Sequence, residues 1–265
     1  MILALLSLWV KKNPWIWSSM GALSLFLAFS SGLLTSAALI PLSLLAIIFW
    51  GLQWNVKGLG RYLLVMAGFL IAAALFYHIL LGFPSPIEFM GTEIIYGKLL
   101  AGLLLLAWPV STLISCGERT LFFKSSLPLA LLGAFLLLIV VLYLQIAAWH
   151  PKLSLVFFGW SILYLICTII PEEALLRGFM QKELFNLLGG GFKAHIGCIC
   201  ISGSLFSLFH LNWINDLSTF PLILLAGFIY STLYQITKNV ETSILCRFVV
   251  SSLYFLFFFG SASSY

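Results

Sequence analysis

The sequence predicts an all-α membrane protein, a polytopic bundle of about eight or nine membrane-spanning helices. Of its 265 residues, 62% are hydrophobic and only 8% are charged, whereas about a quarter of the residues of a soluble domain are charged. Long runs without Asp, Glu, Lys or Arg recur along the chain, and most approach the roughly 20 residues that a helix needs to cross the hydrocarbon. No polar segment is long enough to form a separate soluble domain.

The predicted helices follow these uncharged runs in chain order. The runs cover residues 14–34, 37–54, 62–82, 99–116, 127–148, 153–170, 196–215, 219–237 and 248–260. The ten apolar residues ahead of Lys11 are too short to cross, and they lack the preceding positive charge of a signal peptide. We expect them to form an interfacial lead-in to the first helix.

The positions of lysine and arginine in the short loops predict the orientation of the bundle. If every run crosses, most cations fall on one side: Lys11, Lys12, Lys57, Arg61, Arg119, Lys124, Arg177, Lys182, Lys193 and Lys238. The alternate loops carry only Lys98, beside Glu88 and Glu93, and Lys152. The N-terminus is therefore predicted to be cytoplasmic. This topology accounts for the net charge of +5, so no nucleic-acid partner is expected and the lipid bilayer is the predicted surrounding.

The cysteines give no sign of a metal site. Most of the five cysteines lie within apolar runs, where cysteine behaves as a small hydrophobic residue. Cys198 and Cys200 have the wrong spacing for a zinc knuckle, and no His-Glu-x-x-His pair occurs in the chain. We therefore expect neither a metal ion nor another cofactor.

The first candidate for chemistry is the stretch PEEALLRGF, which begins at Pro171 directly after an uncharged run. If a helix starts near this proline, Glu173 and Arg177 lie one turn apart and can form an ion pair. Glu172 is rotated by about 100° from that face and is left free to point into a cavity. A glutamate in a partly dry site is a candidate general base. A cytoplasmic helix cap with a surface salt bridge is the alternative.

The second candidate is the run Phe206-Ser207-Leu208-Phe209-His210. Phe206 and His210 are again four residues apart, so the phenylalanine ring can pack beside the imidazole and fix its orientation. Small residues just before them allow a neighbouring helix to approach closely. Taken alone, a histidine at the end of a helix is more typical of an interface. Asn212 follows closely and could orient His210 or a substrate backbone, or lie in a solvated loop.

Together the two motifs resemble the CAAX protease and bacteriocin-processing family, also called the Abi family of glutamic intramembrane proteases. The resemblance covers about residues 150–260. It implies that Glu172 activates the attacking water, that Glu173 and Arg177 support it, and that His210 helps to position the water with Phe206 beneath it.

The third motif of that family, His-x-x-x-Asn, is altered in this sequence. Arg247 stands at the histidine position and Ser251 at the asparagine position. Three explanations stay open. Arg247 could itself stabilise the oxyanion, it could reach to the cytoplasmic interface and leave the site weakened, or the protein could be a relative that binds without cutting.

The catalytic hypothesis makes a geometric demand. If residues 153–170 and 196–210 are simple antiparallel spans, Glu172 and His210 lie about 21 Å apart along the membrane normal. They can share a water only if the intervening segment enters the membrane or a flanking run is kinked. Convergence of Glu172 and His210 below the membrane surface is therefore the structural test of the hypothesis.

The resemblance also implies an activity and a division of the chain. Residues 1–150 are expected to form supporting helices that give access to substrate, and residues 151–265 the catalytic core. The expected activity is metal-independent hydrolysis of a peptide bond in a membrane-tethered protein or peptide: a CAAX end, a bacteriocin leader or a C-terminal sorting anchor, as in the myxosortase-like branch. A prokaryotic inner membrane is the expected location. The alternative is a non-catalytic immunity or scaffold protein.

Overall fold

The computed structural model describes residues 14–32, 34–54, 56, 58–89, 92–107, 126–143, 151, 155–211 and 219–258, and helices account for most of them. In the first half the elements are α2 (Pro14–Ser30), the short 3₁₀ turn η1 (Ser36–Ala38), α3 (Leu39–Gln53), α4 (Leu59–Phe76), β1 (Ile87–Phe89), β2 (Thr92–Ile94), α5 (Tyr96–Ala107) and α7 (Leu127–Tyr143). The two strands form an antiparallel hairpin in which Glu88 faces Glu93.

Within its described residues, the second half contains helices and short connections and no strand. Its elements are α8 (Val156–Tyr164), η4 (Leu165–Ile169), α9 (Ile170–Glu173), η5 (Ala174–Gln181), α10 (Lys182–Leu187), α11 (Gly191–Phe209), α12 (Phe220–Thr237) and α13 (Val240–Phe258). The first five of these are consecutive and form one continuous helix from Val156 to Leu187.

The predicted all-α membrane bundle is confirmed. Five helices within the described residues are long and apolar enough to cross a membrane, and three shorter apolar helices accompany them. Large apolar side chains such as Phe26, Ile40 and Phe135 are exposed on the outside of the bundle, as expected for surfaces in contact with lipid tails. The predicted total of eight or nine spans stays a prediction.

The helix from Val156 to Leu187 corrects the prediction that a span ends at residue 170 and a new helix starts near Pro171. Proline inside an α-helix removes a hydrogen bond and clashes with the carbonyl four residues earlier. Here the preceding segment η4 is π-helical, so its backbone hydrogen bonds join residues five apart rather than four. The helix therefore continues through the Glu172–Glu173 pair, which lies near its middle.

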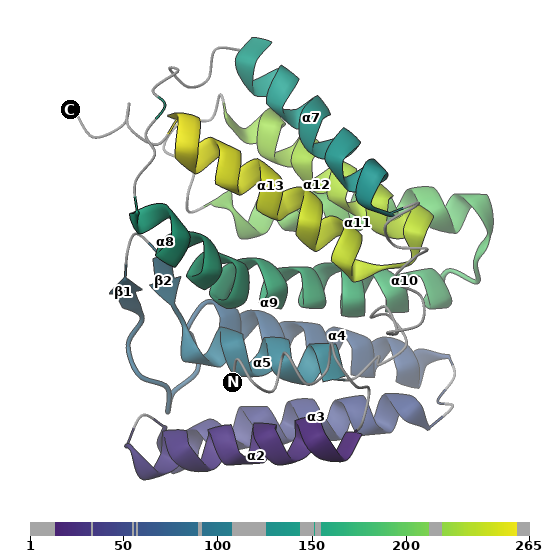
Figure 1. Cartoon of the computed structure of the whole chain (residues 1–265). Coiled ribbons are helices and arrows are strands. Elements are labelled where there is room, and N and C mark those ends of the chain that lie inside the picture. Colours follow the sequence, from purple (N-terminus) through teal and green to yellow (C-terminus); the bar gives the residue numbers. More distant parts are fainter. Residues whose placement is uncertain are drawn as a thin grey trace.

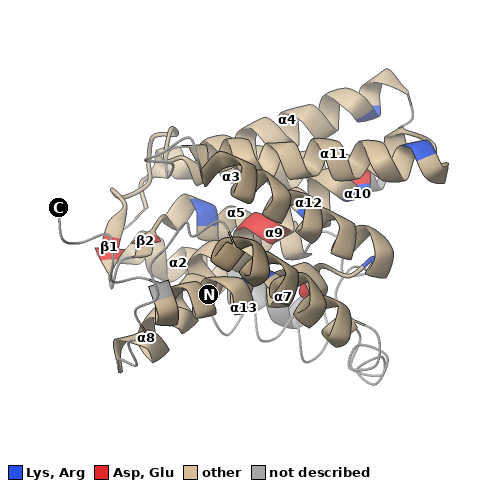
Figure 2. Cartoon of the chain, turned by 90° about the horizontal axis from the view of Figure 1, so that it is seen from above, with Lys and Arg blue, Asp and Glu red and all other residues tan. Residues whose placement is uncertain are grey.

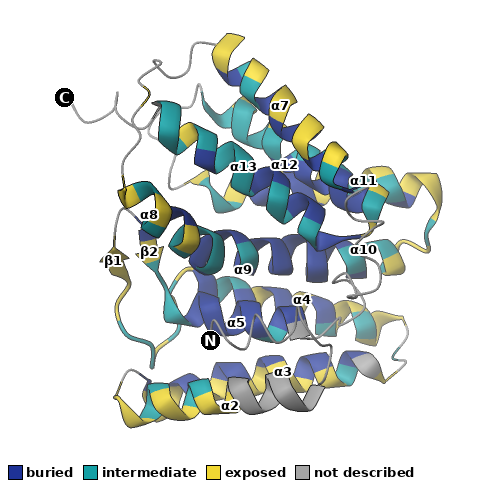
Figure 3. Ribbon diagram, in the orientation of Figure 1, coloured by how far each residue is buried: buried dark blue, intermediate teal, exposed yellow. Residues whose placement is uncertain are grey.

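The helices are stacked around this long helix (Figure 1). Below it in the view lie α4 and α5, followed by α3 and α2; above it lie α11, α12, α13 and α7. The middle of the long helix and α5 are coloured mostly as buried, whereas α7 and the described part of α2 carry many exposed side chains (Figure 3). The charged pair of glutamates is thus in the interior of the bundle.

A turn of three glycines brings α11 back along the long helix. Gly189, Gly190 and Gly191 all have positive φ angles, a conformation that glycine adopts without strain. Starting from this turn, α11 spans 19 residues, or about 28 Å, and His210, which directly follows it, lies beside Glu172. The simple antiparallel pair of spans assumed from the sequence is replaced by a long helix and a shorter one that ends beside its middle.

Candidate active site

Glu172 is buried on α9 and paired with two cations. Its Oε1 accepts a hydrogen bond from Lys98 Nζ at 2.5 Å, and its Oε2 accepts one from Arg247 Nη2. The prediction that Glu172 is free of an ionic partner is therefore wrong. Residue spacing along the helix correctly places Glu172 and Arg177 on different faces. The partners of Glu172 come from other helices, and spacing within one helix cannot predict such contacts.

Glu173 and Arg177 form the predicted ion pair one turn apart. Arg177 Nη1 donates to Glu173 Oε1 at 3.2 Å, and both side chains are inaccessible to solvent. Arg177 Nη2 also donates to the carbonyl of Gly227 on α12, at 3.3 Å. The pair therefore connects the long helix to α12 inside the bundle, and the alternative of a surface salt bridge on a helix cap is excluded.

Arg247 on α13 bridges the two glutamates. Its Nη2 donates to Glu172, and its Nη1 donates to Glu173 Oε1 at 3.2 Å. Its guanidinium lies 4.9 Å from the centroid of the Phe206 ring, and the residue is only 2% exposed. The explanation in which Arg247 reaches to the membrane interface is therefore wrong, and the other two explanations stay open.

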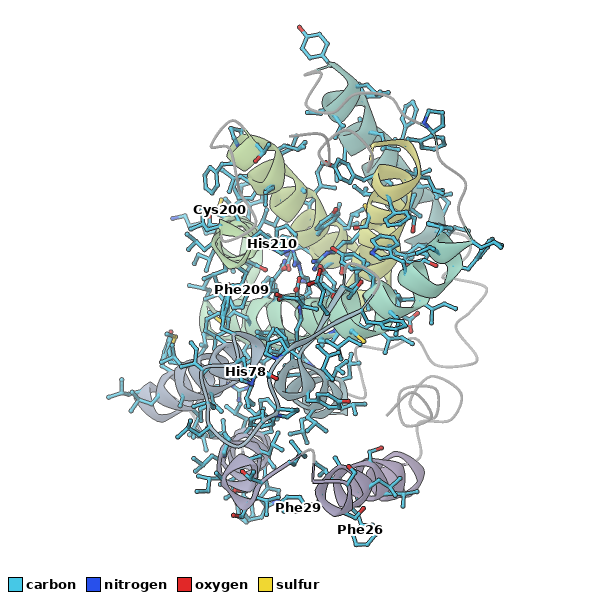
Figure 4. All side chains as sticks on the ribbon, turned by 90° about the vertical axis from the view of Figure 1, so that its left-hand side faces the viewer. Phe26, Phe29, His78, Cys200, Phe209 and His210 are labelled. Carbon is cyan, nitrogen blue, oxygen red and sulfur yellow. The ribbon has the colours of Figure 1, made fainter. Side chains whose placement is uncertain are left out.

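His210 directly follows α11 and faces Glu172. Its Nε2 is 3.5 Å from Glu172 Oε2 and 3.2 Å from Arg247 Nη2. Its ring packs on Phe206 with centroids 4.2 Å apart, as predicted. Figure 4 shows His210 inside the bundle, apart from His78. Glu172 and His210 therefore lie close together, as the catalytic hypothesis requires; their depth in the membrane stays a prediction.

The contacts of His210 define its tautomer. Nδ1 lies 2.8 Å from the carbonyl of Phe206, which can only accept a hydrogen bond, so Nδ1 carries a proton. Arg247 can only donate, so Nε2 facing it is the unprotonated acceptor. Burial, only partly offset by nearby Glu172, lowers the pKa of His210 to about 4. His210 is therefore neutral at physiological pH, with Nε2 free of a proton.

Lys98 is the site residue that the sequence reasoning missed. It lies in the first turn of α5 and is buried, although its position before an uncharged run assigned it to a loop. One turn further along α5, Gly102 lies against the long helix: a Cβ there would meet Pro171 atoms at 2.7 and 2.8 Å. The missing side chain of Gly102 therefore allows α5 to approach closely enough for Lys98 to reach Glu172.

The candidate site thus joins charges from several separate parts of the chain. Figure 2 shows acidic α9 in the interior with a basic position of α5 nearby, while other coloured positions lie toward the ends of helices such as α4 and α11. Isolated charges inside an apolar bundle are costly, so this buried cluster has a specific role in structure or in chemistry.

Other predicted site residues contribute less or cannot be placed. Ser251 lies one turn beyond Arg247 on α13 and is half-buried, and Asn212 falls outside the described residues. Among the residues that the structure describes, no three His, Cys, Asp or Glu side chains gather as potential metal ligands.

A second polar cluster lies farther along the long helix. Gln181 donates to Gln235 on α12 at 3.2 Å, and the amide of Gln235 lies 2.8 Å from His195 Nδ1. His195 is half-buried and packs against Phe185 at a centroid distance of 4.8 Å. This cluster is distinct from the one around Glu172.

Comparison with known proteins gives one match. Residues 152–253 match the family described as type II CAAX prenyl endopeptidase Rce1-like. No curated protein and no solved structure matches the chain. The matched segment includes Glu172, Glu173, Arg177, His210 and Arg247, whereas Lys98 lies outside it. Residues 152–253 therefore form a domain similar to the Rce1-like CAAX protease family, which confirms the resemblance predicted from the sequence motifs.

Proposed function

We propose that this protein is a glutamic intramembrane peptidase that hydrolyses a peptide bond by means of a water activated at Glu172. The convergence of Glu172 and His210, 3.5 Å apart inside an apolar bundle, is the observation that carries the proposal. The Rce1-like domain supports the same reaction class. The catalytic chemistry, the substrate and independence of metal are parts of the proposal.

The first step is the positioning of water between two acceptors. Glu172 Oε2 and unprotonated His210 Nε2 face one another, and a single water can donate one hydrogen to each when it takes the place of Arg247 Nη2 as the donor to Nε2. Such a water is oriented with a lone pair available for attack, and Glu172 accepts its proton as general base. This assignment gives His210 the role of orienting the water, and Phe206 the role of holding the imidazole.

The second step is stabilisation of the oxyanion, which we assign to Arg247. A guanidinium has five N–H donors, and the contacts to Glu172, Glu173 and His210 use only some of them. The remaining donors are available for charge that develops on the attacked carbonyl oxygen. In this proposal Arg247 takes over the task of the altered third motif, and Ser251 is a supporting residue beside it.

The substrate is proposed to be a protein or peptide tethered to the membrane. The site lies among apolar helices, so the scissile bond must enter from the bilayer or along a helix boundary. A CAAX end, a leader peptide and a C-terminal sorting anchor all meet this requirement. A prokaryotic inner membrane is the proposed location.

A non-catalytic binding or scaffold protein is the second candidate. One observation favours it: each oxygen of Glu172 already accepts from a cation, Lys98 or Arg247. Catalysis requires one of these oxygens to turn a lone pair toward water, whereas a purely structural cluster requires no further partner.

Cleavage in reconstituted vesicles distinguishes the two functions. Reporter peptides with a CAAX end, a leader or a C-terminal anchor are incorporated together with the wild type, with Glu172→Gln, or with Arg247→His combined with Ser251→Asn. We expect the wild type to cut at least one reporter. The Glu172→Gln variant should lose at least about 100-fold in rate, within the range typical of a general base.

The double variant, Arg247→His with Ser251→Asn, tests the role of Arg247. A loss of activity in the double variant would show that the arginine has become part of the mechanism, whereas a gain would mark a protease weakened by its third motif. Glu88→Gln, in the exposed hairpin, is the matched control and should cut like the wild type. Absence of cleavage in all proteins, or equal cleavage by Glu172→Gln, would support the scaffold function.

A further inference from the structure

Lys98 offers the site a group that the Rce1-like domain itself does not contain. It lies on α5, outside residues 152–253, yet its ammonium contacts the glutamate that we propose as the base. We infer that Lys98 is a further catalytic residue: it gives a proton to the leaving amine and regains one from Glu172. This inference rests on the proposed peptidase function.

Peptide hydrolysis needs a proton donor as well as a base. The amine that leaves when the C–N bond breaks is a poor leaving group until it is protonated. Glu172 has to be an unprotonated carboxylate to accept the proton from water. A separate proton donor beside it shortens the path of a proton to the leaving nitrogen.

The contacts of Glu172 identify which neighbour can supply that proton. Arg247 keeps its protons under all physiological conditions. His210 carries its only N–H on Nδ1, which is engaged with the Phe206 carbonyl. Lys98 is the remaining described group in hydrogen-bond contact with Glu172, and an amine, unlike a guanidinium, readily releases and takes up a proton.

The position of Lys98 is also well defined. The side chain is buried, and its Nζ lies 2.5 Å from Glu172 Oε1 and 5.8 Å from the centroid of the Phe76 ring on α4. The close approach of Gly102 to Pro171 fixes α5 one turn away. The ammonium is thus held against one oxygen of Glu172, while His210 faces the other oxygen.

The proton balance closes within this pair of residues. An O–H bond of water breaks, its proton passes to Glu172, and the hydroxide forms the new C–O bond. When the C–N bond breaks, the leaving nitrogen takes a proton from the Lys98 ammonium and departs as an amine. The proton on Glu172 then crosses the hydrogen bond to the neutral Lys98 amine, which restores the starting charges.

Two substitutions separate proton donation from simple ion pairing. Lys98→Met removes the charge at similar length, and Lys98→Arg keeps the charge but replaces the amine with a group that does not release its proton. Both variants should lose about 100-fold or more in kcat on the reporter that the wild type cuts. Lys238→Met, at the far end of the bundle where Lys238 lies over the Phe185 ring, should retain wild-type activity.

Chemical rescue supplies a readout that a structural role would not change. In Lys98→Ala, added methylamine or ethylamine should restore part of the lost rate, while guanidine should not. Full activity of Lys98→Arg, or rescue by guanidine as well as by amines, would overturn the inference and reduce Lys98 to an ion-pair partner. Those results would not contradict the peptidase function. That function is contradicted only if the wild type and Glu172→Gln show the same cleavage rate.

Discussion

At the scale of the residue, the side chains that stabilise the site each contact several partners at once. Glu173 Oε1 accepts from both Arg177 and Arg247, and Arg247 contacts both glutamates. Removing one member of a buried ion pair leaves the other charge uncompensated, which costs more than the pair itself contributes. The effects of substitutions here should therefore exceed those at ion pairs near the surface.

Arg177→Met tests this difference. The substitution removes a fully buried guanidinium and leaves Glu173 without one of its two cations. We expect the free energy of unfolding in detergent to fall by about 3–5 kcal/mol. Arg61→Met, which breaks the pair of half-buried Arg61 with Glu183, is the matched control and should cost less than Arg177→Met, because water reaches the Arg61 side of the pair. Equal losses would contradict the assignment of Arg177 to the structural core of the site.

The tautomer of His210 predicts the acidic limit of activity. His210 has its pKa lowered from 6.5 to about 4, mainly by burial. Nε2 therefore stays an acceptor until the pH falls toward 4, where protonation removes its contact with the water. The corresponding contribution to folding stability is complete above pH 6.5 and is lost as the pH falls toward 4. Cleavage rates measured across this range should hold down to about pH 5, whereas a decline centred near 6.5 would show that His210 titrates normally.

At the scale of the element, two close helix contacts determine where the site residues lie. Gly203 on α11 and Gly227 on α12 face each other so closely that a Cβ on Gly227 would lie 2.5 Å from the Gly203 carbonyl oxygen. The same segment of α12 offers the Gly227 carbonyl to Arg177. The separation of α11 and α12 therefore affects both the ion pairs and the position of His210.

Gly227→Ala should separate these helices. Because the added methyl group meets backbone rather than a movable side chain, we expect a loss of about 1–3 kcal/mol in stability and reduced cleavage. The control is Gly178→Ala, where the nearest neighbour of a Cβ is Val240 at 3.5 Å, an ordinary contact distance. Thermal unfolding in detergent measures both variants, and a Gly227→Ala protein as stable as Gly178→Ala would rule out this close-contact account.

The long helix shows how the sequence can indicate an element and still misplace its ends. The uncharged run before Pro171 is correctly helical, and the acidic pair and Arg177 look like the start of a new, water-facing helix. In the structure, Lys98 and Arg247 neutralise these carboxylates, so the helix can continue through them inside the bundle. Charge therefore ceases to mark a span boundary when its partner comes from another helix.

At the scale of the whole molecule, the cations that remain near the ends of helices favour one orientation. The sequence predicts Lys98 and Arg177 in loops on opposite sides of the membrane, but both are buried in the bundle. Apart from Arg247, which is also buried, the other described cations lie near helix ends: Arg61 at the start of α4, Lys182 and Lys193 on either side of the 188–190 turn, and Lys238 after α12. The hairpin β1–β2 lies at the other end of the bundle (Figure 1) and carries Glu88 and Glu93.

This distribution predicts that the 188–190 turn is cytoplasmic and that the hairpin is on the opposite side, by the excess of cations in cytoplasmic loops. Single cysteines introduced at Glu88 and at Gly190, in a chain whose native cysteines are replaced, test the orientation. A membrane-impermeant maleimide should label the first in intact cells and the second only after permeabilisation. The reverse pattern would invert the bundle and place the N-terminus outside.

Metal removal tests the mechanism of the whole enzyme. In the proposed reaction Glu172 and Arg247 supply the base and the oxyanion donor, so dialysis against EDTA should leave the cleavage rate within about twofold of the untreated protein. Loss of activity on chelation, with recovery on adding zinc, would show that a metal activates the water. Glu172→Gln measured in parallel provides the rate expected when the base is absent.

Composition and residue spacing are enough to predict the class of the protein, the order of its helices and several local pairs. Composition and uncharged runs fix these features because the bilayer excludes charge and demands helices. The pairs Glu173–Arg177 and Phe206–His210 follow from spacing within one helix. Only the tertiary structure decided that Lys98 and Arg247 bind Glu172 and that α11 ends beside it, because contacts between distant helices depend on close backbone packing such as that of Gly102 on Pro171.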